Sequence, residues 1–172
     1  IWDEFCDWYV EIAKYRIYHA EEDSQSANCA LWVLKTVLGQ ALKLRHPFMP
    51  FITEEIYGAL VPEEESLMMS SWPVYREDWK FPYATEVIEH VKAITRGIRN
   101  MRAEMNVPNN KRTKVYIISS DSKLLTALEV LKESVKPLML ANDIILHYEK
   151  KDVADDAVSC LLYTSDAADD KA

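Results

Sequence analysis

The chain has 172 residues, of which 49% are hydrophobic and only three are glycine; this favours a helical domain, with at most a small appendage, over a turn-rich β-sandwich or barrel. Its formal net charge of -8 argues against an autonomous nucleic-acid-binding protein, because such domains are usually basic. No apolar run approaches membrane-spanning length and no signal peptide is visible, so we expect no membrane association.

Helices are predicted throughout the first part of the chain. Residues 2–18 place apolar side chains at three- and four-residue steps, which is typical of an amphipathic helix. The polar residues 21–26 predict a loop. Residues 27–45 carry apolar side chains on two faces, which indicates a helix packed on both sides. Pro50 suits the first turn of a further helix over residues 51–60.

A third long helix is predicted over residues 85–105, after an irregular stretch over residues 62–82. The Asn and Pro residues of the segment 106–112 end this helix. The predicted core positions of the helix alternate in steps of four and three, and they are Val87, Val91, Ile94, Ile98, Met101 and Met105.

After this third helix the pattern changes. Residues 115–118 are β-branched and aromatic, which predicts a strand, and residues 144–148 predict a second strand. Between the two strands, residues 124–133 predict a helix whose N-terminus is capped by Asp121 or Ser122.

We therefore expect a mainly α fold, with a helical bundle over residues 1–110 and a small α/β appendage over residues 111–150. Residues 151–172 are expected to be a linker and a tail. From Cys160 onward the tail resembles the translation of a transposon-type sequencing adapter, which marks it as non-native. An ordinary acidic tail is the alternative, and both interpretations predict no function.

Three strings, in this order along the chain, carry a resemblance to a known family. They are Trp2–Tyr9 (WDEFCDWY), His46–Glu55 (HPFMPFITEE) and Ile98–Val107 (IRNMRAEMNV). They resemble the anticodon-binding bundle of the valyl-tRNA synthetase family, a class I group with an antiparallel helical bundle. The middle string is similar to one that the valine, isoleucine and leucine enzymes share. The outer two favour valine over the isoleucyl alternative.

The resemblance implies a parent enzyme that charges valine tRNA isoacceptors, with ATP and Mg as its cofactors. It also implies a cytoplasmic, monomeric parent whose catalytic domain lies elsewhere in the same chain. Neither the H-I-G-H nor the K-M-S-K-S signature of that catalytic domain occurs here, so no catalytic residue and no cofactor is assigned to this sequence. The chain begins at Ile1 inside a predicted helix, so we expect it to be a piece of the enzyme that is inactive alone.

The segment from Lys92 to Lys114 is strongly basic within this acidic chain. It has seven basic residues and one acidic residue, a local net charge of +6. Arginine forks match phosphate geometry, and loops with Asn, Lys and Arg can reach bases and phosphates. The candidate tRNA-binding residues on the solvent side of the helix and in the loop are Lys92, Arg96, Arg99, Asn106, Lys111 and Arg112.

Other interpretations stay open for several residues. Arg102 lies at the edge of the apolar stripe, so a structural role is preferred, for example beside a core carboxylate such as Asp7. The aromatic residues of the first helix could stack on unpaired bases, but their spacing favours a core position for Phe5 and Trp8. The histidines form no pair with metal-ligand spacing, so no metal site is expected.

The three cysteines show no C-x-x-C spacing, which favours reduced thiols in the cytoplasm. A helical interaction module that binds no RNA is the alternative from another functional class. The acidic net charge favours that module, whereas the basic segment and the three strings oppose it.

Overall fold

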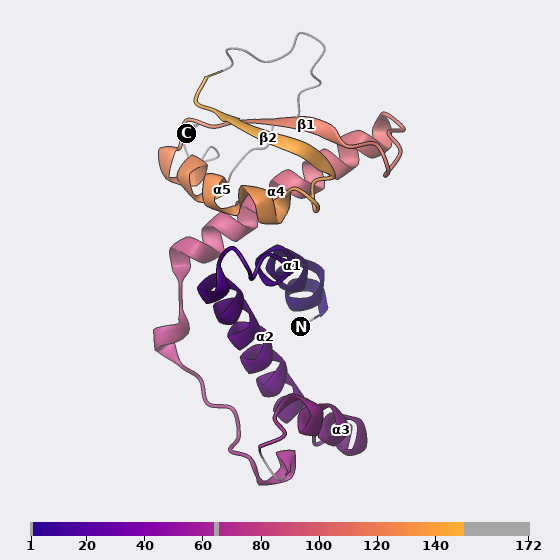
Figure 1. Cartoon of the computed structure of the whole chain (residues 1–172), viewed down its shortest axis with the longest axis vertical. Helices are drawn as coiled ribbons and strands as arrows, with labels where there is room; N and C mark the ends of the chain where they lie inside the picture. Colours follow the sequence, from indigo (N-terminus) through magenta and orange to yellow (C-terminus); the bar gives the residue numbers. More distant parts are fainter. Residues whose placement is uncertain (1, 64–65, 150–172) are drawn as a thin grey trace, which may run out of the picture. The chain divides into compact units, whose positions relative to one another are not determined.

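The computed structural model describes residues 2–63 and 66–149 (Figure 1). The tail from Cys160 and the linker before it lie outside these residues. The contacts divide the chain into two compact units, 1–80 and 81–172. The third long helix therefore groups with the strands, whereas the sequence interpretation placed it in the bundle that ends at residue 110. Most of the described chain is helical with one small sheet, which confirms the mainly α fold with an α/β appendage.

The first unit begins with a π-helix, Trp2–Tyr9, that continues directly into α1, Val10–Tyr18. The next helix, α2 (Ser24–Arg45), starts earlier than predicted. The reason is a side-chain cap, since the carboxylate of Asp23 accepts a hydrogen bond from the backbone N–H of Ser26 at 2.9 Å. The last residues of the predicted loop are therefore helical.

The other end of α2 packs against α3, Pro50–Leu60, whose predicted position and initial proline are confirmed. A short 3₁₀ turn, η2 (Leu67–Met69), contributes Leu67 to the buried cluster between these two helices. Its Leu67 N–H donates to the Glu54 side chain at 2.9 Å. The stretch predicted as irregular also holds a second 3₁₀ turn, η3 (Glu77–Trp79). The buried cluster consists of Leu42, Tyr57, Val61 and Leu67, with Leu38 and Leu60 packed against it.

The second unit is built from one long helix and a strand–helix–strand segment. Its elements are α4 (Pro82–Glu104), β1 (Thr113–Ile118), α5 (Ser122–Val135) and β2 (Ala141–His147). The strands pair in parallel, so the chain must cross over between them, and α5 is that crossover. Because α5 contacts both β2 and α4, the two helices cover the same side of the sheet (Figure 1). Of the two predicted caps for α5, Asp121 is the one used, accepting from the N–H groups of Lys123 and Leu124.

The buried face of α4 differs in part from the predicted stripe. Val87 and Val91 are buried as expected, but Met105 is 52% exposed, so its predicted core position is wrong. The physical reason is that α4 ends at Glu104, and Met105 already belongs to the helix cap. Three polar residues are buried on the same helix, Lys92, Thr95 and Arg102.

Candidate nucleic-acid interface

The end of α4 is a Schellman cap that turns the chain back toward the second unit's sheet. Asn106 has a φ of 52°, in the left-handed region that asparagine tolerates better than most residues. Its N–H donates to the carbonyl of Ala103 at 3.1 Å, and the N–H of Val107 donates to the carbonyl of Arg102 at 2.9 Å. These bonds satisfy the last carbonyls of the helix and fix the direction in which the loop leaves it.

The side chain of Arg102 then holds this loop in place. Its Nη2 donates to the carbonyls of Pro108 at 3.0 Å and Lys111 at 2.6 Å, and its Nη1 donates to the Thr113 hydroxyl at 3.1 Å. Only 7% of the residue is exposed. The predicted structural role of Arg102 is therefore confirmed, but the partners are carbonyls and a hydroxyl rather than a carboxylate such as that of Asp7.

Arg99 lies one turn earlier on α4 and is exposed. Its Nε donates to the carbonyl of Leu138 at 3.0 Å, which orients the guanidinium at the edge of the 136–140 turn. Arg112 reaches the same turn, where its Nη1 contacts the carbonyl of Pro137 at 3.5 Å. The predicted candidates that the structure leaves exposed on α4 and on the loop after it are Arg96, Arg99, Asn106, Lys111 and Arg112.

Lys92 does not lie on the solvent side, and that expectation is wrong. Only 2% of the residue is exposed, and its ammonium forms an ion pair with Glu89. Its position explains the burial, because it directly follows Val91 and lies three residues before Thr95, and both are fully buried. A buried ammonium with a carboxylate partner is poorly placed to meet a phosphate, so Lys92 leaves the candidate interface.

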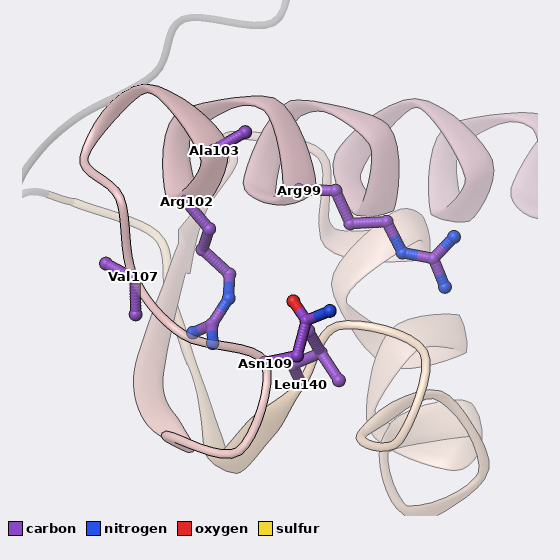
Figure 2. Close-up of a pocket in the computed structure, with 6 residues that line it drawn as sticks. All are labelled: Arg99, Arg102, Ala103, Val107, Asn109 and Leu140. Carbon is purple, nitrogen blue, oxygen red and sulfur yellow. The ribbon is translucent and has the colours of Figure 1, made fainter.

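A pocket with a volume of about 380 Å³ opens between the end of α4 and the two loops beside it (Figure 2). In this view the side chain of Asn109 lies between those of Arg99 and Arg102. Sequence reasoning missed Asn109 and Leu140, because no local pattern brings residue 140 beside residue 102. The lining residues are Arg99, Arg102, Ala103, Val107, Asn109 and Leu140.

Phe5, Trp8 and Tyr9, at the start of the first unit, are poorly placed for stacking on bases. Trp8 is 8% exposed, which confirms its predicted core position, and Phe5 is half-buried. The Phe5 ring lies parallel to that of Tyr9, with the ring centroids 6.0 Å apart. Burial raises the pKa of the Tyr9 phenol above its ordinary value. Because the Phe5 and Tyr9 rings stack on each other, these faces are already covered and do not face an RNA base.

Residues 2–63 and 66–149 contain no group of three or more His, Cys, Asp or Glu side chains that could hold a metal ion. Within the same ranges, every helix is too short or too polar to cross a bilayer.

Comparison with known proteins gives the family of this chain. A family model described as the anticodon-binding domain of tRNA ligase matches residues 1–117, which include the first unit, α4 and most of β1. The chain therefore belongs to the family of anticodon-binding domains of tRNA ligases.

Its relatives specify the kind of ligase. The chain is 44% identical to the valine–tRNA ligase of Halalkalibacterium halodurans over 129 residues, 75% of this chain and 14% of that protein. It is 44% identical to the enzyme of Carboxydothermus hydrogenoformans over 128 residues, 74% of this chain and 14% of that protein. With the enzyme of Anoxybacillus flavithermus the identity is 37% over 146 residues, 85% of this chain and 16% of that protein. The predicted resemblance to the valine enzymes is confirmed, and the chain spans only about one seventh of their length.

Proposed function

We propose that this chain binds the anticodon stem-loop of tRNA as part of a valine–tRNA ligase. The observation that carries the proposal is the match of residues 1–117 to anticodon-binding domains, together with 44% identity to valine enzymes. The whole enzyme would join valine to its tRNA isoacceptors in the cytoplasm, with ATP and Mg used in a catalytic domain of the same, monomeric chain.

The contribution of this part of the enzyme is positional. Anticodon bases are single-stranded, so a protein can read their edges and stack against them. Binding energy at a remote site orients the acceptor end of the tRNA at the catalytic site and supports specificity there. No group in this chain needs to take part in the chemical step.

The proposed contact surface is the exposed basic region at the end of α4 and in the loop after it. Arg96 and Arg99 lie three residues apart, so they share one face of the helix. Lys111 and Arg112 add positive charge in the loop, and the Asn106 amide can donate and accept hydrogen bonds. The acidic net charge of the whole chain does not oppose this, because a polyanion responds to local potential.

The test is binding of folded valine tRNA to the chain at low and moderate salt, with and without Arg99→Ala. Because phosphate contacts release counterions, losing one should make the salt slope shallower by about 1 and weaken binding similarly for valine and unrelated tRNAs. Lys123→Ala is the matched control, since it removes an exposed charge at the start of α5.

Three outcomes would count against the proposal or its details. Absence of tRNA binding by the folded chain at low salt would contradict the proposed function. Wild-type affinity and slope in Arg99→Ala would make Arg99 a solvated surface residue. A loss for valine tRNA alone would mean that Arg99 reads a base rather than a phosphate.

A further inference from the structure

The guanidinium of Arg102 is a buried positive charge with neutral partners. Its hydrogen bonds go to the Thr113 hydroxyl and to the carbonyls of Pro108 and Lys111. Arg102 does not occur in any ion pair found between described residues. A charge taken out of water without a counter-charge is unfavourable, so this site favours an anion from outside.

One donor of the same guanidinium also lacks an acceptor. The Nε of Arg102 is buried and has no hydrogen-bond partner among the residues that the structure describes. Almost all buried donors in folded proteins have a partner, and leaving one unpaired is unfavourable. Three of the five N–H groups of this guanidinium are paired within the described residues, two on Nη2 and one on Nη1. The buried Nε–H therefore remains as a donor for a ligand, together with one N–H of Nη1.

The space for a ligand lies beside this side chain. Arg102 lines the pocket of about 380 Å³ described above, which is within the range of about 300–1,000 Å³ that is typical of small-ligand sites. A second guanidinium, that of Arg99, lines the same pocket, and the Asn109 side chain lies between the two arginines in Figure 2. None of the lining residues is acidic.

We propose that this pocket is an oxyanion site that receives one phosphodiester group of the bound RNA. Guanidinium groups are the preferred partners of phosphate oxygens in proteins, and here Arg102 supplies the Nε–H donor while Arg99 supplies a second positive charge. The Asn109 amide is placed to meet the adjoining sugar or base edge. The choice of RNA rests on the proposed function, whereas the preference for an anion rests on the burial and partners of Arg102.

The direct test follows the Nε–H resonance of Arg102 by NMR in the folded, ¹⁵N-labelled chain. Arg102→Lys assigns the resonance, because lysine lacks this group. Inorganic phosphate is added first and a single-stranded RNA hexanucleotide second, each against sodium chloride of equal ionic strength. We expect saturable movement of the resonance with phosphate and with RNA, and none with chloride. If neither phosphate nor RNA shifts the Arg102 resonance, the proposal is overturned and the pocket holds only water.

A charge placed in the pocket gives an independent test. Ala103 is exposed and lines the pocket, so Ala103→Glu introduces a carboxylate there without disturbing the core. Ala84→Glu makes the same change at an exposed position in the first turn of α4, outside the pocket. We expect Ala103→Glu to weaken phosphate and RNA binding at the Arg102 resonance by about tenfold or more, because like charges repel, and Ala84→Glu to leave it unchanged. Equal affinities for the two variants overturn the proposal.

The outcomes separate this proposal from the function on which it partly rests. If folded tRNA binds the chain while the Arg102 resonance stays still, the pocket is not a phosphate site and the proposed function stands. If phosphate moves the resonance but neither tRNA nor the RNA hexanucleotide binds, the proposed function fails and the assignment to RNA fails with it.

Discussion

The Nη2 of Arg102 donates a hydrogen bond to the backbone carbonyl of Lys111 at 2.6 Å. This bond joins the last turn of α4 to the basic loop that follows. One buried side chain therefore holds the backbone that carries the exposed side chains of Lys111 and Arg112. The position of Lys111 and Arg112 therefore depends on a residue that is itself 7% exposed.

Arg102→Met should lower the free energy of unfolding by roughly 2 kcal/mol, because the loop carbonyls lose their donor while the apolar stem is retained. The expected loss is moderate, since the substitution also removes a buried charge. Urea denaturation followed by circular dichroism measures it. Arg99→Met is the matched control on the exposed face, with an expected change of about 0.5 kcal/mol or less. Equal losses in the two variants would show that Arg102 does not hold the loop.

Asn106→Gly and Asn106→Ala separate the two roles of this residue. At φ 52° glycine is unstrained, so Asn106→Ala should be less stable than Asn106→Gly by about 1 kcal/mol. Denaturant midpoints check this difference. Because Asn106→Gly keeps the cap and removes only the amide, we expect it to weaken tRNA binding without loss of stability. Wild-type tRNA affinity in this variant would leave Asn106 with the cap as its only role.

Glu54 should titrate below the ordinary pKa of a glutamate. The Ser66 hydroxyl is the main cause, and the N–H groups of Leu67 and Met68 also lower the pKa. The ionised form is therefore favoured by folding, so its contribution to stability is present above the unfolded pKa and is lost as the pH falls through the folded pKa. The Leu67 amide resonance, followed from about pH 6 to about pH 3, should report this titration, and Glu54→Gln should abolish it. A midpoint at or above the ordinary value would contradict the assignment.

The chain alone should not activate valine, because its sequence contains neither signature of the ATP site that the resemblance implies. Valine-dependent exchange of pyrophosphate into ATP is the measurement. A full-length valine–tRNA ligase is the positive control, and a reaction without enzyme sets the background. Exchange above that background by the purified chain would contradict this expectation.

The sequence predicted those parts of the fold that depend on neighbours along the chain. Pro50 marked the start of α3, and the two candidate caps Asp121 and Ser122 marked the start of α5, because a proline or a cap acts within a few residues. The break at Asn106 was predicted for the same reason, although its left-handed conformation was not.

The rest of the site depends on residues distant in sequence. The burial of Lys92 was not predicted, because helical periodicity alone placed it on the solvent side that adjoins the apolar stripe. The approach of Leu140 to Arg102 requires the complete crossover through α5, for which no local pattern exists. The left-handed φ of 53° at Leu140 is unusual for leucine, so composition also gave no signal.

The parallel pairing of β1 with β2 has a consequence for how the chain is made. The ribosome releases β1 first, but its partner strand begins only at Ala141, after the whole of α5. The pocket wall at Leu140 and the carbonyl of Leu138 that orients Arg99 also come from this late segment. During synthesis, α4 can form early because its backbone hydrogen bonds are local, whereas the basic loop acquires its final surroundings only when the second strand has emerged.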